Sequence, residues 1–338
     1  MSTTALLFEQ LPDRSVRCQL CRHRCLIANG KRGICRIREN ADGLLISLVD
    51  DLIVAEQIDP VEKKPLFHLL PGSRSYSVAA VGCNFRCLHC QNASIAQYDN
   101  PGGGTLPGHR LPPREAVRHA LAGGCRSLAY TYTEPTVWFE YALATARLAA
   151  EAGLYNIFVT NGYITPEALE MLAPVLHAAN IDLKGFTKEF YRRICGAQLP
   201  EVLDCIRDYH RRNIWLELTT LVIPGENDDQ HQLDGIARFI ADELGPDTPW
   251  HVSRFFPCHR MEDHPPTPLA SLERALEAGD RAGLRYVYEG NVAAGREQTL
   301  CPSCGALVVG RSGYTITSLN LQHGRCGSCG QTLAGIWE

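Results

Sequence analysis

The 338-residue chain lacks the features that mark membrane, nucleic-acid-binding and secreted proteins. Its apolar runs are far shorter than the ~20 residues needed to span a bilayer, so we expect no membrane partner. Neither sign of charge is in large excess, because 33 Lys and Arg stand against 37 Asp and Glu, and we expect no nucleic-acid partner. The N-terminal segment has neither the basic start nor the long apolar stretch of a secretory signal, which predicts a cytoplasmic protein.

Cysteine, by contrast, is abundant. The chain has 15 cysteines, an odd number that cannot all pair, and a reducing compartment would keep them as thiols. Eleven of them fall in three clusters, which points to metal sites. The isolated cysteines are predicted to be small buried hydrophobic residues: Cys125, Cys195, Cys205 and Cys258.

The middle of the chain alternates β-rich runs with helical patterns. Strands are predicted at 75–82, 127–132, 156–160, 180–183, 214–222, 250–256 and 285–288. Helices are predicted at 113–124, 135–152, 165–177, 187–193, 199–211, 229–243 and 268–282. This order indicates βαβ units with a parallel sheet. Because the units number fewer than the eight of a closed TIM barrel, we predict an α/β fold with a partial (βα)6 TIM-type barrel, and a doubly wound sheet as the alternative.

Three regions are expected. Residues 1–70 form an N-terminal Cys-containing region, in which the alternating run 44–58 suggests a small sheet. Residues 71–295 form the barrel core. Residues 296–338 form a zinc-ribbon or rubredoxin-like module, so that small Cys-rich, metal-binding flanks stand at both ends of the core.

Cys83, Cys87 and Cys90 directly follow the first core strand. They therefore lie at the carboxyl end of that strand, where parallel α/β folds build active sites. Three such thiolates can hold three irons of a [4Fe–4S] cluster and leave the fourth iron open for chemistry. A zinc site or three reduced structural cysteines are the alternatives, and the position of the triad favours the cluster.

This pattern resembles the radical S-adenosylmethionine (SAM) superfamily, which carries CxxxCxxC on the loop after the first strand of a partial (βα)6 barrel. The resemblance implies that Cys83, Cys87 and Cys90 hold the cluster and that SAM chelates the open iron. It also implies a flavodoxin- or ferredoxin-type reductant, cleavage of SAM to a 5′-deoxyadenosyl radical, and hydrogen abstraction from an unknown substrate. The residue before the last cysteine is often aromatic in this superfamily and is His89 here, for which we expect packing or hydrogen bonding.

Segments at later strand ends resemble the pyruvate formate-lyase activating enzyme group: TNG (160–162), DxK (182–184) and VIPGxND (222–228). YTEP (132–135) stands where many superfamily members have a Gly-Gly-Glu type motif; its glycines are missing here, and only Glu134 is carried over. The SAM contacts that this resemblance implies are Glu134, Thr160, Asn161, Gly162, Asp182 and Lys184. Asn-Gly alone usually marks a turn and a strand-end Asp often caps a helix. Four such segments in the right order are much less expected by chance.

Two further sets have alternative roles. His251, Arg254 and Phe256 end the strand predicted at 250–256 and are candidate contacts of SAM or substrate, with core or capping roles as the alternative. Lys63 and Lys64 are predicted to form a solvated surface patch. The alternative places their run, 59–73, at the barrel mouth, where it would shape a substrate or partner surface.

The cysteine clusters in the N-terminal and C-terminal flanks predict structural metal sites. Cys18, Cys21, Cys25 and Cys35 can converge because Gly30 and Gly33 permit tight turns, and either a structural zinc or an auxiliary iron–sulfur cluster suits four thiolates. Unliganded thiols are the alternative. The C-terminal knuckles resemble a zinc ribbon or rubredoxin-like site, with zinc ahead of iron and His323 as a competing ligand: Cys301, Cys304, Cys326 and Cys329.

Nearly the whole chain resembles the radical SAM enzyme family of the AmmeMemoRadiSam system, a relative of the pyruvate formate-lyase activating enzymes. The segments that carry this resemblance are 18–40, 59–73, 81–92, 132–136, 288–292 and the CPSCG tail. It implies a Memo-like and an AMMECR-like partner protein. A glycyl-radical-enzyme activase is the alternative enzyme, and a multi-zinc binding module is the alternative of another class. The net charge of −4 and the long α/β core argue against the module.

Overall fold

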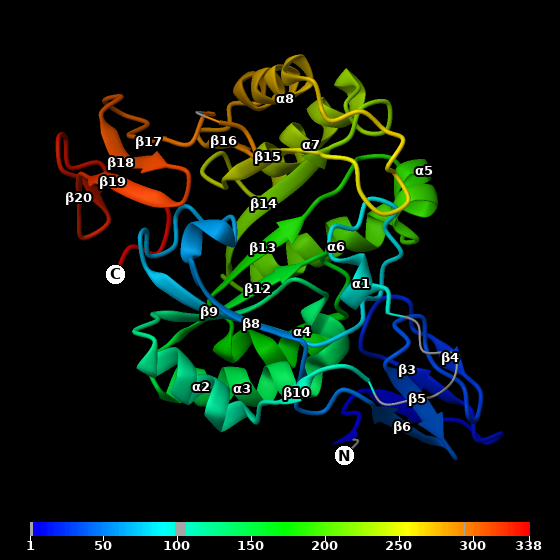
Figure 1. The fold of residues 1–338 in the computed structure, drawn as a ribbon. Helices are drawn as coiled ribbons and strands as arrows, with labels where there is room; N and C mark the ends of the chain where they lie inside the picture. Colours follow the sequence, from blue (N-terminus) through cyan, green and yellow to red (C-terminus); the bar gives the residue numbers. More distant parts are fainter. Residues whose placement is uncertain (1–2, 99–105, 294) are drawn as a thin grey trace.

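The computed structural model describes residues 3–98, 106–293 and 295–338, and its centre is an eight-stranded sheet of order β16-β15-β14-β13-β12-β11-β9-β8 (Figure 1). Seven strands run parallel: β9 (Arg74–Ala79), β11 (Ser127–Tyr130), β12 (Tyr155–Thr160), β13 (Ala178–Asp182), β14 (Trp215–Val222), β15 (Trp250–Arg254) and β16 (Val287–Gly290). The predicted α/β class with a mostly parallel sheet is confirmed. Among the described residues β8 and β16 do not pair with each other, so the sheet is open.

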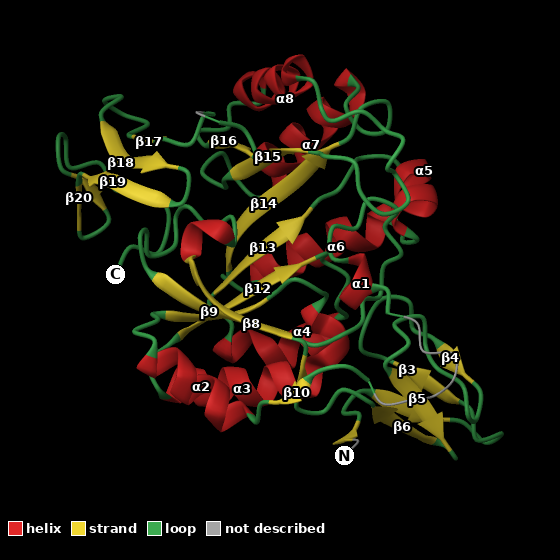
Figure 2. Cartoon of the chain, viewed as in Figure 1, coloured by secondary structure: helices red, strands yellow, loops and turns green. Residues whose placement is uncertain are grey.

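Helices connect the successive parallel strands (Figure 2). The longer ones are α2 (Pro113–Ala122), α3 (Phe139–Glu151), α4 (Pro166–Leu172), α6 (Leu199–Arg211), α7 (Gln230–Glu243) and α8 (Leu269–Arg281). The spacing of apolar residues explains the packing of α6, because Val202, Cys205, Ile206 and Tyr209 recur every three or four positions and are all buried. The longest described helix, α7, has 14 residues, and none of the helices described is long and apolar enough to cross a bilayer.

Short elements depart from the predicted helices. The helix expected at 135–152 begins with a 3-10 turn, η2 (Pro135–Trp138), because Pro135 directly follows the Glu134 side chain that caps it. The helix expected at 187–193 is α5 (Lys188–Phe190) followed by a π-helical turn, η4 (Tyr191–Cys195). The other short helices are α1 (Ala93–Ala96), η1 (Val61–Lys63) and η3 (Ala173–Val175).

The run 44–58 does not form one small sheet. Its first part, β6 (Leu44–Ser47), pairs with β5 (Arg38–Ala41) and β1 (Thr3–Thr4) as expected. Its last part continues into β8 (Ala55–Pro60), which pairs antiparallel with β9 over six residues. The central sheet therefore begins at Ala55 and not at residue 71, because the hydrogen-bonding edge of β9 is filled by the strand that precedes it in sequence.

The two cysteine-rich flanks lie on different sides of the central sheet (Figure 1). The N-terminal flank adds the sheet β2 (Phe8–Gln10), β3 (Val16–Cys18), β4 (Leu26–Ile27) and the pair β7 (Leu52–Ile53), β10 (His109–Arg110). The C-terminal flank has the sheet β17 (Thr299–Leu300), β18 (Leu307–Ser312), β19 (Thr315–Leu319) and the hairpin β20 (Leu321–Gln322), β21 (Arg325–Cys326). Arg311 of β18 joins this flank to the core by donating 2.7 Å to the carbonyl oxygen of Phe67.

Candidate active site

A central pocket opens where the parallel strands end. After β9 the backbone turns at Gly82, whose φ is +102° and whose Cβ, if it had one, would lie 3.0 Å from Ile37. This turn leads into the triad loop. Of the predicted site residues, those that line the pocket are Cys83, Cys87, Cys90, Glu134, Thr160, Asn161, Asp182 and Lys184. Residues scattered over about 100 positions meet here because the carboxyl ends of parallel strands share one edge of the sheet.

Glu134 ties two strand ends together. Its Oε1 accepts hydrogen bonds from the Thr136 hydroxyl (2.6 Å) and the Thr160 hydroxyl (2.8 Å), and its Oε2 accepts one from the Asn161 backbone N–H (2.8 Å). Burial raises the pKa of this carboxyl, against the effect of those donors. Oε2 keeps room for one more donor. Glu134 thus fixes the loop after β12 and offers one acceptor position toward the pocket.

Asn161 lies between the triad and the opposite wall. Its Nδ2 donates to Asn84 Oδ1 at 2.7 Å and lies 3.7 Å from Cys83 Sγ. Its Oδ1 is buried and has no hydrogen-bond partner among the described residues. A buried acceptor without a donor costs free energy, and a ligand ammonium or hydroxyl would satisfy it. The pocket therefore fits a ligand with a donor group near Cys83.

The wall formed by β13 is charged. Lys184 Nζ lies 2.7 Å from Asp182 Oδ2 and is largely buried. Burial alone would lower the pKa of Lys184, but Asp182 and the nearby Cys87 raise it well above its usual value, so the ammonium stays charged. Burial lowers the pKa of His89 to about 3, with a further contribution from Lys184, and this imidazole faces the pocket in its neutral form. This wall offers a fixed cation to an anionic ligand group.

Two predicted SAM contacts lie outside the pocket lining. Gly162 has a φ of +66°, and a Cβ there would meet Ile181 at 2.8 Å, so glycine permits the turn after β12 and presents no side chain. His251 is buried, and its Nε2 lies 2.7 Å from Glu217 Oε2. Side chains two residues apart lie on the same face of a strand, so Ser253 of β15 shares the face of His251. Ser253 lies nearer the end of the strand and lines the pocket.

Arg254 and Phe256 also lie outside the pocket lining, and they contact each other. Arg254 stacks over the Phe256 ring at 5.1 Å and donates 2.8 Å to the carbonyl oxygen of Thr267. Phe256 itself is exposed.

The predicted surface patch of two lysines is wrong for Lys64. This side chain is only 2% exposed, and its Nζ lies 2.6 Å from Asp59 Oδ2. Lys63 is 43% exposed, bonds Asp59 Oδ1 at 2.8 Å and lines the central pocket. The η1 turn separates the two lysines because consecutive residues of a helical turn point in different directions. Within the run 59–73, Lys63 and Pro65 line the central pocket, whereas Leu66, Leu69 and Leu70 lie in a buried cluster with residues of the central sheet.

Several pocket residues were not predicted as site residues: Asn92, Tyr132, Thr219, Asn291 and Tyr314. Asn92, Tyr132 and Asn291 do lie in segments that carry the family resemblance, whereas Thr219 and Tyr314 do not. Tyr314 belongs to the C-terminal module, between β18 and β19, and is 52% exposed at the pocket. A residue contributed by a separate flank has no local pattern that could reveal its place in the site.

The C-terminal cysteines form a compact set of metal ligands. The sulfurs of Cys301, Cys304, Cys326 and Cys329 all lie within 4.8 Å of one another, with Cys301 to Cys329 at 3.6 Å and Cys304 to Cys326 at 3.8 Å. A tetrahedral zinc with Zn–S bonds of about 2.3 Å requires sulfur separations of about 3.8 Å. The four thiols thus fit a single zinc-sized ion. His323 does not belong to this set, and its side chain is 88% exposed and pairs with Glu338.

The N-terminal cysteines Cys18, Cys21, Cys25 and Cys35 line one cavity of their own. The isolated cysteines Cys125, Cys195 and Cys205 are buried as predicted, whereas Cys258 is half-buried and donates to the carbonyl oxygen of His89.

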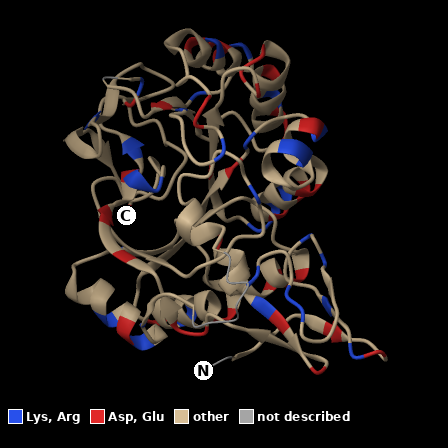
Figure 3. Ribbon diagram, turned by 45° about the vertical axis from the view of Figure 1, so that its right-hand side comes forward, with Lys and Arg blue, Asp and Glu red and all other residues tan. Residues whose placement is uncertain are grey.

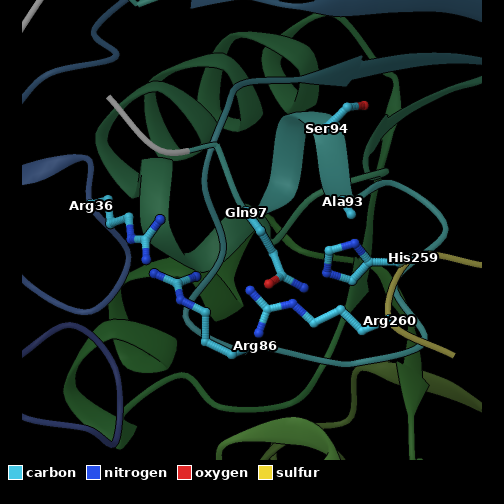
Figure 4. A pocket seen from close by; sticks show the side chains of 7 residues that line it. All are labelled: Arg36, Arg86, Ala93, Ser94, Gln97, His259 and Arg260. Atoms are coloured by element: carbon cyan, nitrogen blue, oxygen red, sulfur yellow. The ribbon is translucent and has the colours of Figure 1, made fainter. Parts of the chain in front are cut away.

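Charges of both signs are interspersed over the chain (Figure 3). A local exception is a basic surface pocket, which we define by its lining residues Arg36, Arg86, Ala93, Ser94, Gln97, His259 and Arg260. Figure 4 shows its three guanidinium groups pointing toward one another. Arg86 comes from the triad loop, and Arg36 directly follows Cys35. Three arginines and, among the described residues, no acidic residue line this pocket, which gives it a local excess of positive charge.

Comparison with known proteins identifies the superfamily. The sequence family described as "Radical SAM superfamily" matches residues 77–235, the part that contains the triad and the first strand ends. The chain is 42% identical over 332 residues to an uncharacterized protein of Methanocaldococcus jannaschii, covering 97% of this chain and 98% of that protein. It is 23% identical over 165 residues to the pyruvate formate-lyase 1-activating enzyme of Escherichia coli K12, covering 48% of this chain and 66% of that enzyme.

Among solved structures, Streptococcus suis SuiB bound to S-adenosylmethionine is similar in fold, with a TM-score of 0.51 and 14% identity over 68% of this chain and 53% of that one. At this identity the likeness concerns the fold alone. The family match and the three-cysteine loop at the ends of the parallel strands show that the chain belongs to the radical SAM superfamily, whose members are enzymes.

Proposed function

We propose that this enzyme binds a [4Fe–4S] cluster at Cys83, Cys87 and Cys90 and SAM beside it in the central pocket. The superfamily implies both groups. When bound, they supply the reductive cleavage of SAM to methionine and a 5′-deoxyadenosyl radical, which abstracts hydrogen from a substrate still to be identified. We also propose that the open sheet is a partial (βα)6 barrel and that the protein is located in the cytoplasm.

The single observation that carries this proposal is the meeting of the triad with three strand ends in one pocket. Burial raises the pKa of the Cys83 thiol, so a bound cation is needed to hold it as a thiolate. The orphan Oδ1 of Asn161 would accept from the SAM ammonium, and the cation of Lys184 would face anionic groups across the pocket. Tyr314, at the pocket but on the other module, is a candidate for the substrate side.

The test is SAM cleavage after anaerobic reconstitution with iron and sulfide. We expect the wild type to form 5′-deoxyadenosine with dithionite, and the Cys83→Ala, Cys87→Ala, Cys90→Ala triple variant to form none. Cys125→Ala is the matched control, because this buried cysteine lies outside the pocket and should leave the activity near that of the wild type. A reconstituted wild type that held no iron at the triad and cleaved no SAM would contradict the proposal.

For the biological setting, we propose the AmmeMemoRadiSam system, with a Memo-like and an AMMECR-like protein as partners. The segment-by-segment resemblance of the chain supports this assignment. The test is to add each purified partner to the reconstituted enzyme and to follow 5′-deoxyadenosine together with any change in partner mass. A rate and a partner mass that both stay unchanged would count against the system.

The runner-up is a glycyl-radical-enzyme activase. The similarity to the E. coli pyruvate formate-lyase 1-activating enzyme favours it, although the match covers only 48% of this chain. An activase would generate a glycyl radical, visible by EPR, on a co-encoded glycyl radical enzyme. The multi-zinc binding module is the third hypothesis, and zinc in all three cysteine clusters without iron would favour it.

We further propose that the reductant is an acidic protein of the flavodoxin or ferredoxin type and that it docks at the basic surface pocket. The charge of the pocket and its place beside the triad loop support this site. Arg86 links the two cysteine loops there, because its Nη1 donates 3.0 Å to the Cys83 carbonyl and its Nη2 donates to the Ile34 carbonyl. A donor bound there would lie beside both cysteine sites.

A further inference from the structure

The four N-terminal cysteines line a cavity that is separate from the central pocket. The backbone folds its cysteines together, because Cys18 N–H donates 2.9 Å to the Cys25 carbonyl and Arg24 turns with a φ of 43°. Cys18, Cys21 and Cys35 are buried, and Cys25 is half-buried. Four inward-facing thiols around one cavity are a ligand set and not an assembly of unrelated core residues.

Sulfur separations distinguish this cavity from the C-terminal zinc-like site. Within the described ranges, only the C-terminal cysteines bring three or more sulfurs within 4.8 Å of one another. The N-terminal cysteines are more widely spaced, and the same holds for the central triad of Cys83, Cys87 and Cys90. A [4Fe–4S] cube binds each thiolate at a different iron, so it requires a wider set of sulfurs than a single ion does. The spacing favours a cluster.

Arg38 gives an independent indication of an anionic group in the cavity. Its side chain is 1% exposed and lines the cavity. Nε donates 3.2 Å to the Val137 carbonyl and Nη2 pairs with Glu140, but Nη1 has no hydrogen-bond partner among the residues described. A buried N–H group without a hydrogen-bond acceptor costs free energy. The sulfides and thiolates of a cluster are such acceptors and are negatively charged.

The cavity is next to the central pocket. Asn84 lines the cavity, is adjacent in sequence to Cys83, and accepts the hydrogen bond from Asn161 in the central pocket. On the other side, His23 Nε2 lies 2.9 Å from the Asn84 carbonyl oxygen, and His23 also lines the cavity. Asn84 therefore contacts residues of both cysteine sites. An isolated antiparallel β-bridge between Cys21 and Ile164 holds the N-terminal loop against the segment after β12.

We propose that Cys18, Cys21, Cys25 and Cys35 hold an auxiliary [4Fe–4S] cluster that passes single electrons to the central site. One electron from a low-potential protein donor reduces the auxiliary cluster, and the cluster is oxidised again when that electron moves to the central cluster. No bond forms or breaks and no proton moves in this step. The relay rests on the proposed function, whereas the presence of the auxiliary cluster does not.

The test uses the full chain with Cys83, Cys87 and Cys90 all changed to alanine, isolated and reconstituted anaerobically. We expect about four irons and four sulfides per chain, and an EPR signal after reduction with dithionite. Adding Cys21→Ala and Cys25→Ala should remove both the iron and the signal, while the zinc content of the C-terminal site stays unchanged as a measure of folding. Zinc in place of iron in the cavity, or no metal there, would overturn the proposal.

Arg38 provides a test that leaves all ligands in place. Arg38→Gln removes a buried positive charge and should shift the reduction midpoint of the triad-lacking chain to a more negative potential, because the added electron is less stabilised. Arg38→Lys should shift it less. Arg22→Gln is the matched control, since Arg22 lies in the same loop but pairs with Glu201 and Asp208 outside the cavity. Equal midpoints for Arg38→Gln and Arg22→Gln would count against a cluster beside Arg38.

The relay has a separate spectroscopic readout. In the fully reduced wild type, two adjacent paramagnetic clusters should broaden the EPR spectrum beyond the sum of the two single-site spectra. A spectrum equal to that sum would overturn the relay. Iron in the triad-lacking chain combined with no SAM cleavage by the wild type would contradict the proposed function alone. SAM cleavage by a wild type holding only the triad's four irons would contradict the auxiliary cluster alone.

Discussion

Nζ of Lys64 lies 2.6 Å from Oδ2 of Asp59, and both side chains are almost completely buried behind the wall of the central pocket. Tyr132 donates 2.7 Å to the same Asp59 oxygen, and the Lys64 ammonium lies 5.0 Å from the centre of the Tyr132 ring. Lys63, which lines the pocket, bonds the other oxygen. Asp59 therefore holds the run 59–73 against the loop after β11.

Lys64→Ala should lower the free energy of unfolding by about 3 kcal/mol, because it leaves a buried carboxylate without its closest cation. Urea unfolding of the reconstituted protein measures the change. Lys188→Ala is the matched control at an exposed position and should change stability by less than about 0.5 kcal/mol. Equal effects of the two substitutions would mean that Lys64 contributes no buried ion pair.

His68 should make stability depend on pH. Burial lowers its pKa to about 4, and the neutral ring is held by the Ala334 carbonyl oxygen (2.8 Å) and the Tyr288 hydroxyl (2.7 Å). The unfolded chain, with a His pKa of about 6.5, binds more protons between these values, so this contribution is complete above about pH 6.5 and is lost as the pH falls toward 4.

The stability difference between wild type and His68→Gln should therefore shrink by about 2 kcal/mol between pH 7 and pH 5. Urea unfolding of both proteins at each pH measures it, and effects of acid that are common to both cancel. His323→Gln, at a side chain that is 88% exposed, should keep the pH dependence of the wild type. A constant difference for His68→Gln would refute this assignment.

Asn161→Ala should weaken SAM binding by about tenfold, which corresponds to the loss of one hydrogen bond of about 1.4 kcal/mol. Calorimetric titration of the reconstituted enzyme gives the Kd, and the iron content must be compared because Asn161 also contacts Cys83. Asn29→Ala, at an exposed position outside the pocket, is the control. An unchanged Kd at equal iron content would show that Asn161 does not bind SAM.

The C-terminal module should carry one zinc per chain. Cys304→Ala should remove it, because three thiolates and no nearby fourth ligand bind the ion less tightly. Metal analysis by mass spectrometry measures zinc and iron separately. Since Arg311 ties this module to Phe67, the loss of zinc should also expose the segment near Phe67 to hydrogen exchange. Iron at this site after aerobic purification would instead favour a rubredoxin-like centre.

Charge reversal at the basic surface pocket should separate protein reductants from chemical ones. Arg260→Glu should lower the rate of SAM cleavage with a flavodoxin by tenfold or more at low salt, and much less with dithionite, which does not need to dock. The difference should decrease as ionic strength rises. Arg238→Glu, on α7 and outside this pocket, is the control. Equal losses with both reductants would exclude docking at this pocket.

Local sequence patterns predicted the parallel core and the cysteine triad. The repeated change from β-rich to helical periodicity predicted the seven parallel strands within a few residues of their observed bounds, because burial on both faces leaves continuous apolar runs. The family resemblance implied Glu134, Asn161 and Lys184 as site residues, and the shared edge at which parallel strands end explains why they meet in one pocket. These features depend on short-range patterns and on one general property of the fold.

The sequence by itself therefore determined the class of the fold, the cysteine loop and the strand-end residues. Only the tertiary structure decided that Lys64 is buried and Lys63 lies in the pocket, that β8 joins the central sheet, that His251 pairs with Glu217, and that Tyr314 reaches the pocket from another module. Each of these depends on contacts between residues far apart in the chain. The burial of a charge or the position of a flank is set by its partners, and local periodicity does not encode them.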